Sequence, residues 1–403
     1  MFDYFRGGWF RVYKKTIRDV EIAGKKVLVR VDFNVPLQDG QIVNDTRILK
    51  AMPTIKYLQR QGAKIILMTH LGRPKGKVVP SLSVKPLTAR LSDLLETKVL
   101  FAADCGGQES RRVVSQLKPG QAALLENLRF YAAEEENDPA FAKALAALGD
   151  FYVNDAFSAS HRDHASTVGV TKYLPAVAGF LMEREIYVLS EVLERACRPF
   201  VVILGGAKVS DKIFVIENLL KKADCLLIGG AMANNFLRAE GHQVGKSKLE
   251  TGKIALAKEL LKQAEKKGVK IILPQDVVVA EEFEAEAVSE IAAVEAIPAD
   301  KMILDIGPQT LGAFKNVIQK AGMIVWNGPL GVYEFPKFAQ GTNEIVKAIA
   351  EAPGKAVIGG GDVVAAVEKT GLAAKIYHLS TGGGASLAFL GGKVLPGVAA
   401  LRD

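Results

Sequence analysis

The sequence lacks several features that would place a protein in a specialised class. It has three cysteines, Cys105, Cys197 and Cys225, which are scattered and outside any C-x-x-C spacing. This excludes a disulfide scaffold and indicates a reducing compartment. No apolar run approaches the roughly 18 residues that a membrane span requires. We therefore expect a cytoplasmic protein without a membrane partner.

The N-terminal segment lacks the pattern of a secretory signal. Residues 1–13 carry six aromatic residues and two arginines, but no continuous apolar stretch and no small-residue cleavage site. A start codon assigned too early, a disordered tail and a docking segment are three open interpretations. Aromatics interleaved with arginine are also typical of RNA-binding surfaces, but the pattern is confined to this segment. We therefore expect no nucleic-acid partner for the remainder of the chain.

The composition is that of an ordinary globular chain. Of 403 residues, 49% are hydrophobic and 24% are charged, which excludes disordered and collagen-like proteins. The length predicts two or three domains. The net charge of +8 is divided by residue type, because 15 of 17 arginines lie in residues 1–200 and 21 of 35 lysines lie after them. The two halves are therefore expected to hold anions differently, since arginine offers a rigid fork and lysine a mobile point charge.

Short apolar segments alternate with helical patterns along the chain. Strand composition is found at 26–31, 64–69, 99–101, 122–125, 151–153, 200–204, 225–228, 270–273, 323–326, 356–358 and 376–379. Helical patterns lie between most of them, at 46–61, 138–148, 212–222, 251–267 and 343–351. Continuous apolar strands joined by helices are typical of parallel sheets covered on both faces. The predicted fold class is α/β.

The strands fit either one barrel or two open sheets. A charged helical stretch without strand character ends at Pro199, and we interpret it as a link between two doubly wound domains with a cleft between them. The predicted domains are residues 1–183 and 200–390, joined by a linking helix at 184–199 and followed by a C-terminal segment, 391–403. Ligands of such sheets bind beyond the carboxyl ends of the strands.

In the first half, polar side chains follow almost every strand. They are Asp32, Asn34, His70, Arg73, Arg129 and His161-Arg162, while Arg47 opens a helix after the first loop. Four guanidinium forks at one sheet edge suit a small ligand that bears phosphate, carboxylate and hydroxyl groups. Two other readings fail: His161-Arg162-Asp163 lacks the Asn and the D-F-G motif of protein kinases, and His161-x-x-His164 lacks a third metal ligand.

In the second half, glycine-rich turns follow the strands. They are Gly205-Gly206 before Lys208 and Lys212, Gly359-Gly360-Gly361 before Asp362, and Gly382-Gly383-Gly384. Glycine loops that open helices present N–H groups to phosphate oxygens. A helix starting at Lys208 would place Lys208 and Lys212 on one face. Asp362 at such a mouth indicates Mg²⁺, and Glu334 is a candidate for a ribose hydroxyl.

Two familiar nucleotide motifs are missing. No G-x-G-x-x-G fingerprint occurs, and Gly241-x-x-x-Gly245-Lys246-Ser247 is one residue short of a P-loop and follows no strand. An arginine-lined site for a small anion and a lysine and glycine site for a nucleotide together predict phosphoryl transfer across the cleft. Another acid kinase that forms an acyl phosphate, and a catalytically silent binding protein, are the alternatives.

At this point a family resemblance is visible. The motifs Val31-Asp32-Phe33-Asn34-Val35-Pro36, His70-Leu71-Gly72-Arg73-Pro74, Glu126-Asn127-Leu128-Arg129-Phe130, Gly205-Gly206-Ala207-Lys208-Val209, Trp326-Asn327-Gly328-Pro329 and 382–386 resemble, in order, those of the phosphoglycerate kinase family. The resemblance runs from about Lys15 to the C-terminus.

The resemblance implies a fold and a reaction. The fold would be two Rossmann-like domains joined by a helix, with the C-terminal segment packed on the first domain, in a monomer. The reaction would be reversible phosphoryl transfer between 1,3-bisphosphoglycerate and Mg-ADP, which gives 3-phosphoglycerate and ATP in glycolysis. The domains would close by a hinge motion. No general base would be needed, because a carboxylate with an intrinsic pKa near 3.5 is ionised at pH 7.

The resemblance also implies residue roles. Contacts to 3-phosphoglycerate are expected from Asp32, Phe33, Asn34, Arg47, His70, Leu71, Gly72, Arg73, Arg129 and Arg162. Nucleotide contacts are expected from Lys208, Lys212, Asn327, Glu334, Gly360, Gly361, Asp362 and Val363, with Asp362 holding Mg²⁺. Catalytic contacts to the transferring group are expected from Arg47, Lys208, Lys212 and Gly383.

Six positions depart from the usual family pattern. Val363 stands where Ser or Thr usually follows the magnesium-binding Asp, and Asp163 adds a charge beside Arg162. Residues 158–160 read Ser-Ala-Ser where Gly-Thr-Ala is usual, and Gly391 replaces a Glu.

Overall fold

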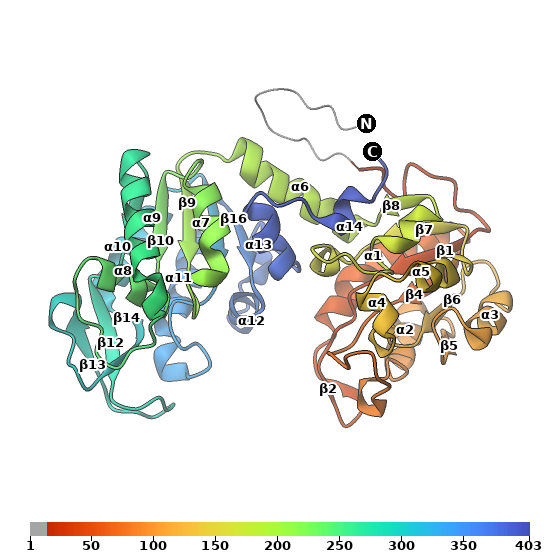
Figure 1. Ribbon diagram of the computed structural model, residues 1–403, viewed down its shortest axis with the longest axis horizontal. Helices are drawn as coiled ribbons and strands as arrows, with labels where there is room; N and C mark the ends of the chain where they lie inside the picture. Colours follow the sequence, from red (N-terminus) through yellow and green to blue (C-terminus); the bar gives the residue numbers. More distant parts are fainter. Residues whose placement is uncertain (1–13) are drawn as a thin grey trace. The chain divides into compact units, whose positions relative to one another are not determined.

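The computed structural model describes residues 14–403, so the aromatic segment 1–13 lies outside the described residues (Figure 1). The chain folds into two compact units. Unit 1 runs up to Tyr187 and also takes in Val394–Asp403, and unit 2 is Val188–Lys393. No helix among residues 14–403 is long and apolar enough to cross a membrane.

Unit 1 is built on a parallel sheet of six strands. In sheet order these are β5 (Leu100–Ala102), β6 (Ala122–Leu125), β4 (Lys64–Met68), β1 (Lys26–Arg30), β7 (Phe151–Asn154) and β8 (Ala176–Ala178). The five predicted strands are confirmed to within one or two residues. The sixth, β8, was not predicted because three residues of Ala-Val-Ala carry little strand signal.

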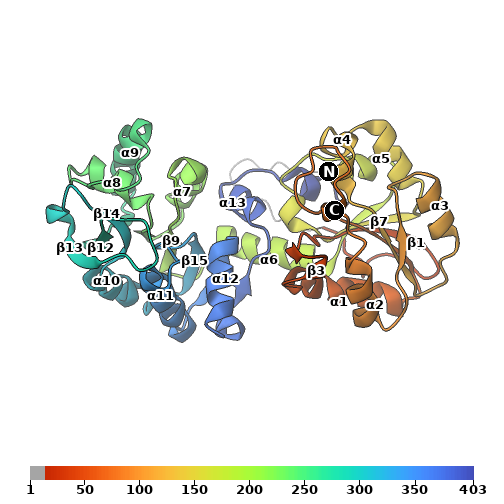
Figure 2. The same ribbon diagram turned by 90° about the horizontal axis from the view of Figure 1, so that it is seen from below.

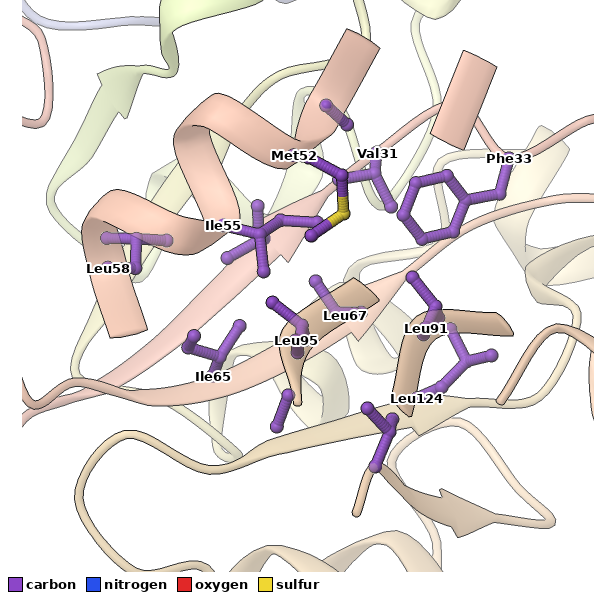
Figure 3. Packing of buried hydrophobic residues seen from close by; sticks show 14 of the residues in the cluster. Val31, Phe33, Met52, Ile55, Leu58, Ile65, Leu67, Leu91, Leu95 and Leu124 are labelled. Atoms are coloured by element: carbon purple, nitrogen blue, oxygen red, sulfur yellow. The ribbon is translucent and has the colours of Figure 1, made fainter. Parts of the chain in front are cut away.

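Helices cover both faces of this sheet. They are α1 (Thr46–Arg60), α2 (Leu87–Leu95), α3 (Gln108–Ser115), α4 (Ala132–Glu135) and α5 (Pro139–Ala146), and a two-stranded hairpin, β2 (Leu37–Gln38) and β3 (Gln41–Ile42), precedes α1. Figure 2 shows α1 and α2 on one face and α4 and α5 on the other. Apolar side chains of α1 and α2 pack on alternate residues of β1 and β4, including Ile55, Leu91 and Leu67 (Figure 3). This core fixes the strand ends.

Unit 2 has a second parallel sheet of six strands. In sheet order they are β11 (Lys270–Ile272), β10 (Cys225–Ile228), β9 (Phe200–Leu204), β15 (Met323–Asn327), β16 (Lys355–Gly359) and β17 (His378–Leu379). All six were predicted. In chain order the sheet reads 3-2-1-4-5-6, the strand order of dinucleotide-binding Rossmann sheets, and it switches direction between β9 and β15.

Unit 2 also contains an antiparallel sheet that the sequence pattern did not predict. Its order is β13 (Ser289–Ala293), β12 (Asp276–Ala280) and β14 (Met302–Ile306). Most of β13 is exposed or half-buried, so it lacks the continuous apolar run by which the other strands were identified. A small separate core that includes Ala280, Leu304 and Phe338 supports this sheet.

The helices of unit 2 lie on both faces of its parallel sheet. They are α7 (Ile213–Leu219), α8 (Ala233–Ala239), α9 (Ile254–Lys266), α10 (Pro308–Ile318), α11 (Gln340–Glu351), α12 (Gly361–Lys369) and α13 (Gly384–Leu390). Figure 2 shows α7, α8 and α9 on one face and α10, α11 and α12 on the other. Trp326 of β15 is fully buried in the core beneath α10 and α11.

The helix α6 (Phe180–Arg195) crosses the division between the units. It begins four residues before the predicted linking helix, because the carboxylate of Asp155, just beyond β7, accepts hydrogen bonds from the amides of Leu181 (2.9 Å) and Met182 (3.2 Å). It ends at Arg195, and Pro199, which cannot continue a helix, precedes β9.

The last ten residues pack on unit 1. The amide of Gly397, in α14 (Pro396–Ala399), donates to the carbonyl of Ser160 (2.9 Å), and Asn154 donates to the carbonyl of Gly397 (3.1 Å). Lys15 and Arg402 are joined by a backbone hydrogen bond of 3.0 Å. Leu401 is 3% exposed, so an apolar anchor accompanies these bonds.

This anchor is testable. Leu401→Ala removes a buried side chain and should lower the free energy of unfolding by about 2–3 kcal/mol. Val394→Ala, at a side chain 77% exposed in the same segment, is the matched control and should change it by less than about 0.5 kcal/mol. Urea unfolding measures both. Equal effects of the two substitutions would contradict the anchoring role of Leu401.

Candidate active site

Strand register brings the predicted polar residues of unit 1 to one edge of the sheet. Arg30, the last residue of β1, pairs with Met68 of β4 and Asn154 of β7. Residues two positions further along, Asp32 and His70, therefore lie just beyond the strand ends at the same level. The order of strands along the chain also changes direction between β1 and β7, the position at which open α/β sheets bind ligands.

At this edge the carboxylate of Asp32 accepts hydrogen bonds from three donors. One carboxylate oxygen, Oδ2, accepts hydrogen bonds from Arg47 at the start of α1 and from the hydroxyl of Ser158 (2.5 Å). The other, Oδ1, accepts from the amide of Asn34 (3.1 Å). Burial opposes ionisation, but the charge of Arg47 and the hydrogen bonds from Ser158 and Asn34 hold the pKa of Asp32 below its ordinary value. Asp32 is therefore an ionised acceptor at pH 7.

Hydrogen bonds join the loop after β1 to the loop after β4 and to Arg129. The side-chain oxygen of Asn34 accepts from the amide of Gly72 (2.9 Å), and the carbonyl of Gly72 accepts from Arg129 (2.8 Å). Phe33 and Leu71 are buried, so their side chains hold the loops and only their backbones can meet a ligand. The structure thus brings Asp32, Asn34, Gly72 and Arg129 together.

His70 is a neutral hydrogen-bond donor. Burial, with the charge of Arg30, holds its pKa well below 6.5. Arg30 Nη2 lies 3.1 Å from His70 Nδ1, and because a guanidinium can only donate, Nδ1 is the acceptor. The ring proton is therefore on Nε2, which can donate to an anion.

Guanidinium groups crowd this edge. Arg129 is 5% exposed, and burial together with the charges of Arg162 and Arg30 lowers its pKa from 12.5 to about 10. It still carries its charge at pH 7, and Glu135 compensates it at 3.4 Å. A buried positive cluster of this kind favours a small ligand with more than one negative charge.

The other two predicted arginines of this edge, Arg162 and Arg73, are less buried than Arg129. Arg162 is half-buried, donates to His161 Nε2 (3.3 Å) and lies close enough to lower the pKa values of His70 and Arg129. Arg73 is exposed on the loop that begins at Gly72, and the structure does not bring it into the cluster. Asp163, the added charge of the sequence, accepts from Asn137 (2.7 Å).

Several residues of this site were not predicted. Arg30 is 1% exposed and is held by the hydroxyl of Ser166 (2.9 Å), which in turn donates to the fully buried Glu134 (2.6 Å). His164 lies 3.7 Å from Glu134, so its partner is a carboxylate. A charge inside an otherwise apolar strand is the signal that could have identified Arg30. Glu134 and Ser166 carry no such signal.

In unit 2 the glycine-rich turns follow the strands on either side of the point between β9 and β15 where the strand order changes direction. Register pairs Leu204 with Asn327 and Asn327 with Gly359, so Gly205, Gly328 and Gly360 follow the strands at one level. A Cβ on Gly205 would lie 2.1 Å from the carbonyl oxygen of Pro329, so only glycine fits. Gly206, at φ +93°, turns the chain, and a Cβ there would lie 3.2 Å from Lys212 Nζ.

The two lysines do not share a helix face, and this prediction was wrong. The α-helix α7 begins at Ile213, preceded by the 3₁₀ turn η5 (Ser210–Lys212). Glu250 fixes this turn by accepting from the amide (3.0 Å) and hydroxyl (2.6 Å) of Ser210. Lys208 precedes this turn and is exposed outside any helix, whereas Lys212 is 8% exposed beside Gly206.

Lys212 is a lysine whose side chain is buried. Burial lowers its pKa from the ordinary 10.5, and Asp211 and Asp362 oppose that shift. Asp362 is exposed in the first turn of α12, next to Gly361. Val363 is fully buried in the core, so only its amide can face a ligand.

The remaining residues predicted to contact the nucleotide follow other strands of unit 2 or precede its helices. Asn327 is 6% exposed, and its side-chain amide lies against Gly360, where a Cβ would be 3.1 Å away. Gly383 directly precedes α13, and the hydroxyls of Ser380 and Ser386 bond across that turn (2.6 Å). Glu334 is exposed and follows Tyr333, and burial, with a smaller contribution from the charge of Asp362, raises the pKa of the Tyr333 hydroxyl.

The residues present fit a magnesium nucleotide. No group of three or more His, Cys, Asp or Glu within residues 14–403 could hold a metal by itself. Mg²⁺ in kinases is characteristically held by one or two carboxylates together with substrate phosphates and water. The exposed Asp362, at a helix N-terminus that also offers amides to phosphate, meets that requirement.

Comparisons with known proteins agree with this arrangement. A family model described as phosphoglycerate kinase matches residues 17–393. A phosphoglycerate kinase of Moorella thermoacetica is 55% identical over 390 residues, which are 97% of this chain and 99% of that protein. A phosphoglycerate kinase of Roseiflexus castenholzii is 56% identical over 392 residues, with the same two coverages.

Solved structures are similar over the same length. The phosphoglycerate kinase of Coxiella burnetii has a TM-score of 0.87 at 40% identity, over 96% of this chain and 98% of that one. The enzyme of Pyrococcus horikoshii has a TM-score of 0.86 at 37% identity, with the same coverages. From sequence and structure alike, this chain belongs to the phosphoglycerate kinase family.

Proposed function

We propose that this protein is a glycolytic phosphotransferase that moves a phosphoryl group between 1,3-bisphosphoglycerate and Mg-ADP, giving 3-phosphoglycerate and ATP. Its family membership supports the reaction. The structural observation that carries the proposal is the buried cluster of Arg129, Arg30 and neutral His70 beside ionised Asp32, which suits a ligand with phosphate, carboxylate and hydroxyl groups.

The acid substrate would be held in unit 1. Arg129, Arg162 and the Nε2–H of His70 would meet its negative charges, and Asp32 and Asn34 would accept and donate bonds at its hydroxyl. Arg73 would contribute from the exposed loop. Arg47, whose side chain is 42% exposed, is free enough on one side to reach the group being transferred.

The nucleotide would be held in unit 2. The amides of Gly360, Gly361 and Val363 would meet its phosphates, and Asn327, Glu334 and Gly383 would complete the contacts. Lys212 and Lys208 would neutralise the charge on the phosphates and on the transferring group. Mg²⁺, when bound with the nucleotide at Asp362, neutralises phosphate charge.

The chemistry requires positioning more than proton transfer. The attacking carboxylate is ionised at pH 7, and in-line transfer depends on bringing two anions together and stabilising the charge between them. Because the acid site belongs to unit 1 and the nucleotide site to unit 2, we propose closure about α6, which would also exclude water.

Two further properties belong to this proposal. A monomer is sufficient, since each site is built from residues of one chain. A cytoplasmic location suits a glycolytic enzyme and agrees with Cys105, Cys197 and Cys225, all of which are free thiols. Light scattering during size-exclusion chromatography tests the monomer. The central test is ATP formation from 1,3-bisphosphoglycerate and Mg-ADP, and its absence would refute the function.

Arg47→Ala tests the transfer step. Removing a donor aimed at developing charge should lower kcat by about 100- to 1,000-fold, with the KM for ADP changed by less than about twofold. Arg60→Ala, at the exposed end of the same helix, is the control and should keep the activity of the unchanged protein. A coupled assay measures both. Normal turnover of R47A would contradict the role of Arg47.

Lys212→Met tests the buried lysine. Methionine keeps an unbranched side chain of nearly the same length but has no charge. We therefore expect kcat to fall by about 100-fold or more and nucleotide affinity to weaken. Lys221→Met, at an exposed lysine after α7, should leave both unchanged. Initial rates with ADP titrations measure the effect. If both variants behave alike, the role of Lys212 fails.

Asp362→Asn tests the metal position. The amide keeps the shape but loses the charge that Mg²⁺ prefers, so the Mg²⁺ concentration for half-maximal rate should rise by about tenfold. Glu368→Gln, later in the same helix, is the control. The measurement is a Mg²⁺ titration of initial rate at fixed ADP. An unchanged titration of D362N would place the metal elsewhere.

A further inference from the structure

The turn after β7 holds a side chain to which the proposed function assigns no role. Ser158 is in the 3₁₀ turn η3 (Phe157–Ala159), inside the stretch that departs from the usual family pattern. Its hydroxyl donates to Asp32 Oδ2 at 2.5 Å. This contact joins β7's turn to the loop after β1, 126 residues earlier in the chain.

The turn that carries Ser158 is firmly held. The side chain of Asn154 accepts from the amide of Ala156 (3.1 Å) and donates to the C-terminal segment at Gly397 (3.1 Å). On either side of Ser158, Phe157 is 0% and Ala159 is 4% exposed. The hydroxyl is therefore delivered to Asp32 by a rigid support.

The contact completes the hydrogen bonding of the Asp32 carboxylate. Oδ2 receives Ser158 and Arg47, and Oδ1 receives the amide of Asn34. Three donors from three separate segments fix the plane of the carboxylate. A carboxylate oxygen can accept two bonds, so Oδ1 keeps the capacity for one more donor. A substrate hydroxyl supplies such a donor.

Arg47 alone could not fix this carboxylate. Its side chain is 42% exposed, and the proposed function also requires it at the transferring group. When Arg47 moves toward that group, Oδ2 would lose its charged partner in a position where the Asp32 side chain is only 11% exposed. The Ser158 hydroxyl remains as a donor to the same oxygen, so the orientation of Asp32 does not depend on Arg47.

We propose that Ser158 is a positioning residue for the acid substrate: its hydroxyl holds the Asp32 carboxylate in the orientation that receives the hydroxyl group of 3-phosphoglycerate. The proposal rests on the proposed function. Ser158 acts through Asp32 and does not itself touch the reacting atoms. Its loss should therefore weaken substrate binding more than turnover.

A pH readout follows from the same geometry. The groups that face Asp32 are Ser158, the amide of Asn34, Arg47 from α1 and His70 after β4, and Arg30, Arg129 and Arg162 surround His70. Loss of a donor to the ionised form raises the pKa of a carboxyl group. Asp32 acts as an acceptor only when ionised, so the acid limb of kcat/KM for 3-phosphoglycerate should move to higher pH.

The experiment uses S158A, S158T and S160A in the full chain. Ser160 is two residues away in the same departing stretch, is fully buried and donates to the carbonyl of Ala156 (3.2 Å), so S160A is a matched loss of one hydroxyl. In S158A the KM for 3-phosphoglycerate should rise by about 5- to 30-fold, with kcat within about threefold and the KM for ATP unchanged. S158T, which keeps a hydroxyl, should restore most of the affinity.

The outcomes separate the two proposals. A selective rise in this KM, with the acid limb shifted in S158A but not in S160A, supports positioning by Ser158. An unchanged KM, an unshifted acid limb, or equal effects in S158A and S160A would overturn it while leaving the enzyme's function intact. Absence of 3-phosphoglycerate kinase activity in the unsubstituted protein would instead refute the proposed function.

Discussion

Positive charge held out of water at the carboxyl edge of the unit 1 sheet constrains the structure around it. Arg30 and Arg129 are almost fully buried, and burial together with the charges of Arg162 and Arg30 lowers the pKa of Arg129. Glu135 lies 3.4 Å from Arg129, and Ser166 links Arg30 to the carboxylate of Glu134. Burial, with the charge of Arg30, keeps His70 neutral. A buried cluster of positive charge of this kind suits a small polyanion, which is the class of ligand that we propose for unit 1.

Unit 2 meets an anion by a different physical route. Its strand ends carry glycines, and backbone approaches backbone so closely that a Cβ at Gly205 would overlap the carbonyl of Pro329. The bare amides after these turns and one buried ammonium, that of Lys212, replace the guanidinium cluster. A flexible polyphosphate with its own metal suits such a surface, whereas a small rigid acid suits forks with fixed angles.

Much of this could be predicted from the sequence. The parallel strands were identifiable because short, β-branched apolar runs such as 200–204 alternate with longer helical patterns, which is typical of parallel sheets covered on both faces. Within each unit the residues just beyond those strands were then expected to meet, Asp32 with Arg129 in unit 1 and Gly205 with Gly360 in unit 2, because parallel strands of one sheet end at one edge. The antiparallel sheet was missed, since β13 is too exposed to show a buried pattern.

The sequence by itself determined the α/β class and the family, and it predicted the two kinds of anion site, because each depends on residue types in and just after the strands. Tertiary structure alone decided which side chains pair. It left Lys208 exposed and buried Lys212, and it joined Glu250 to Ser210 between them. It brought Ser158 to Asp32 and Glu134 behind Arg30. These partners lie far apart in the chain, and only the tertiary fold brings them together.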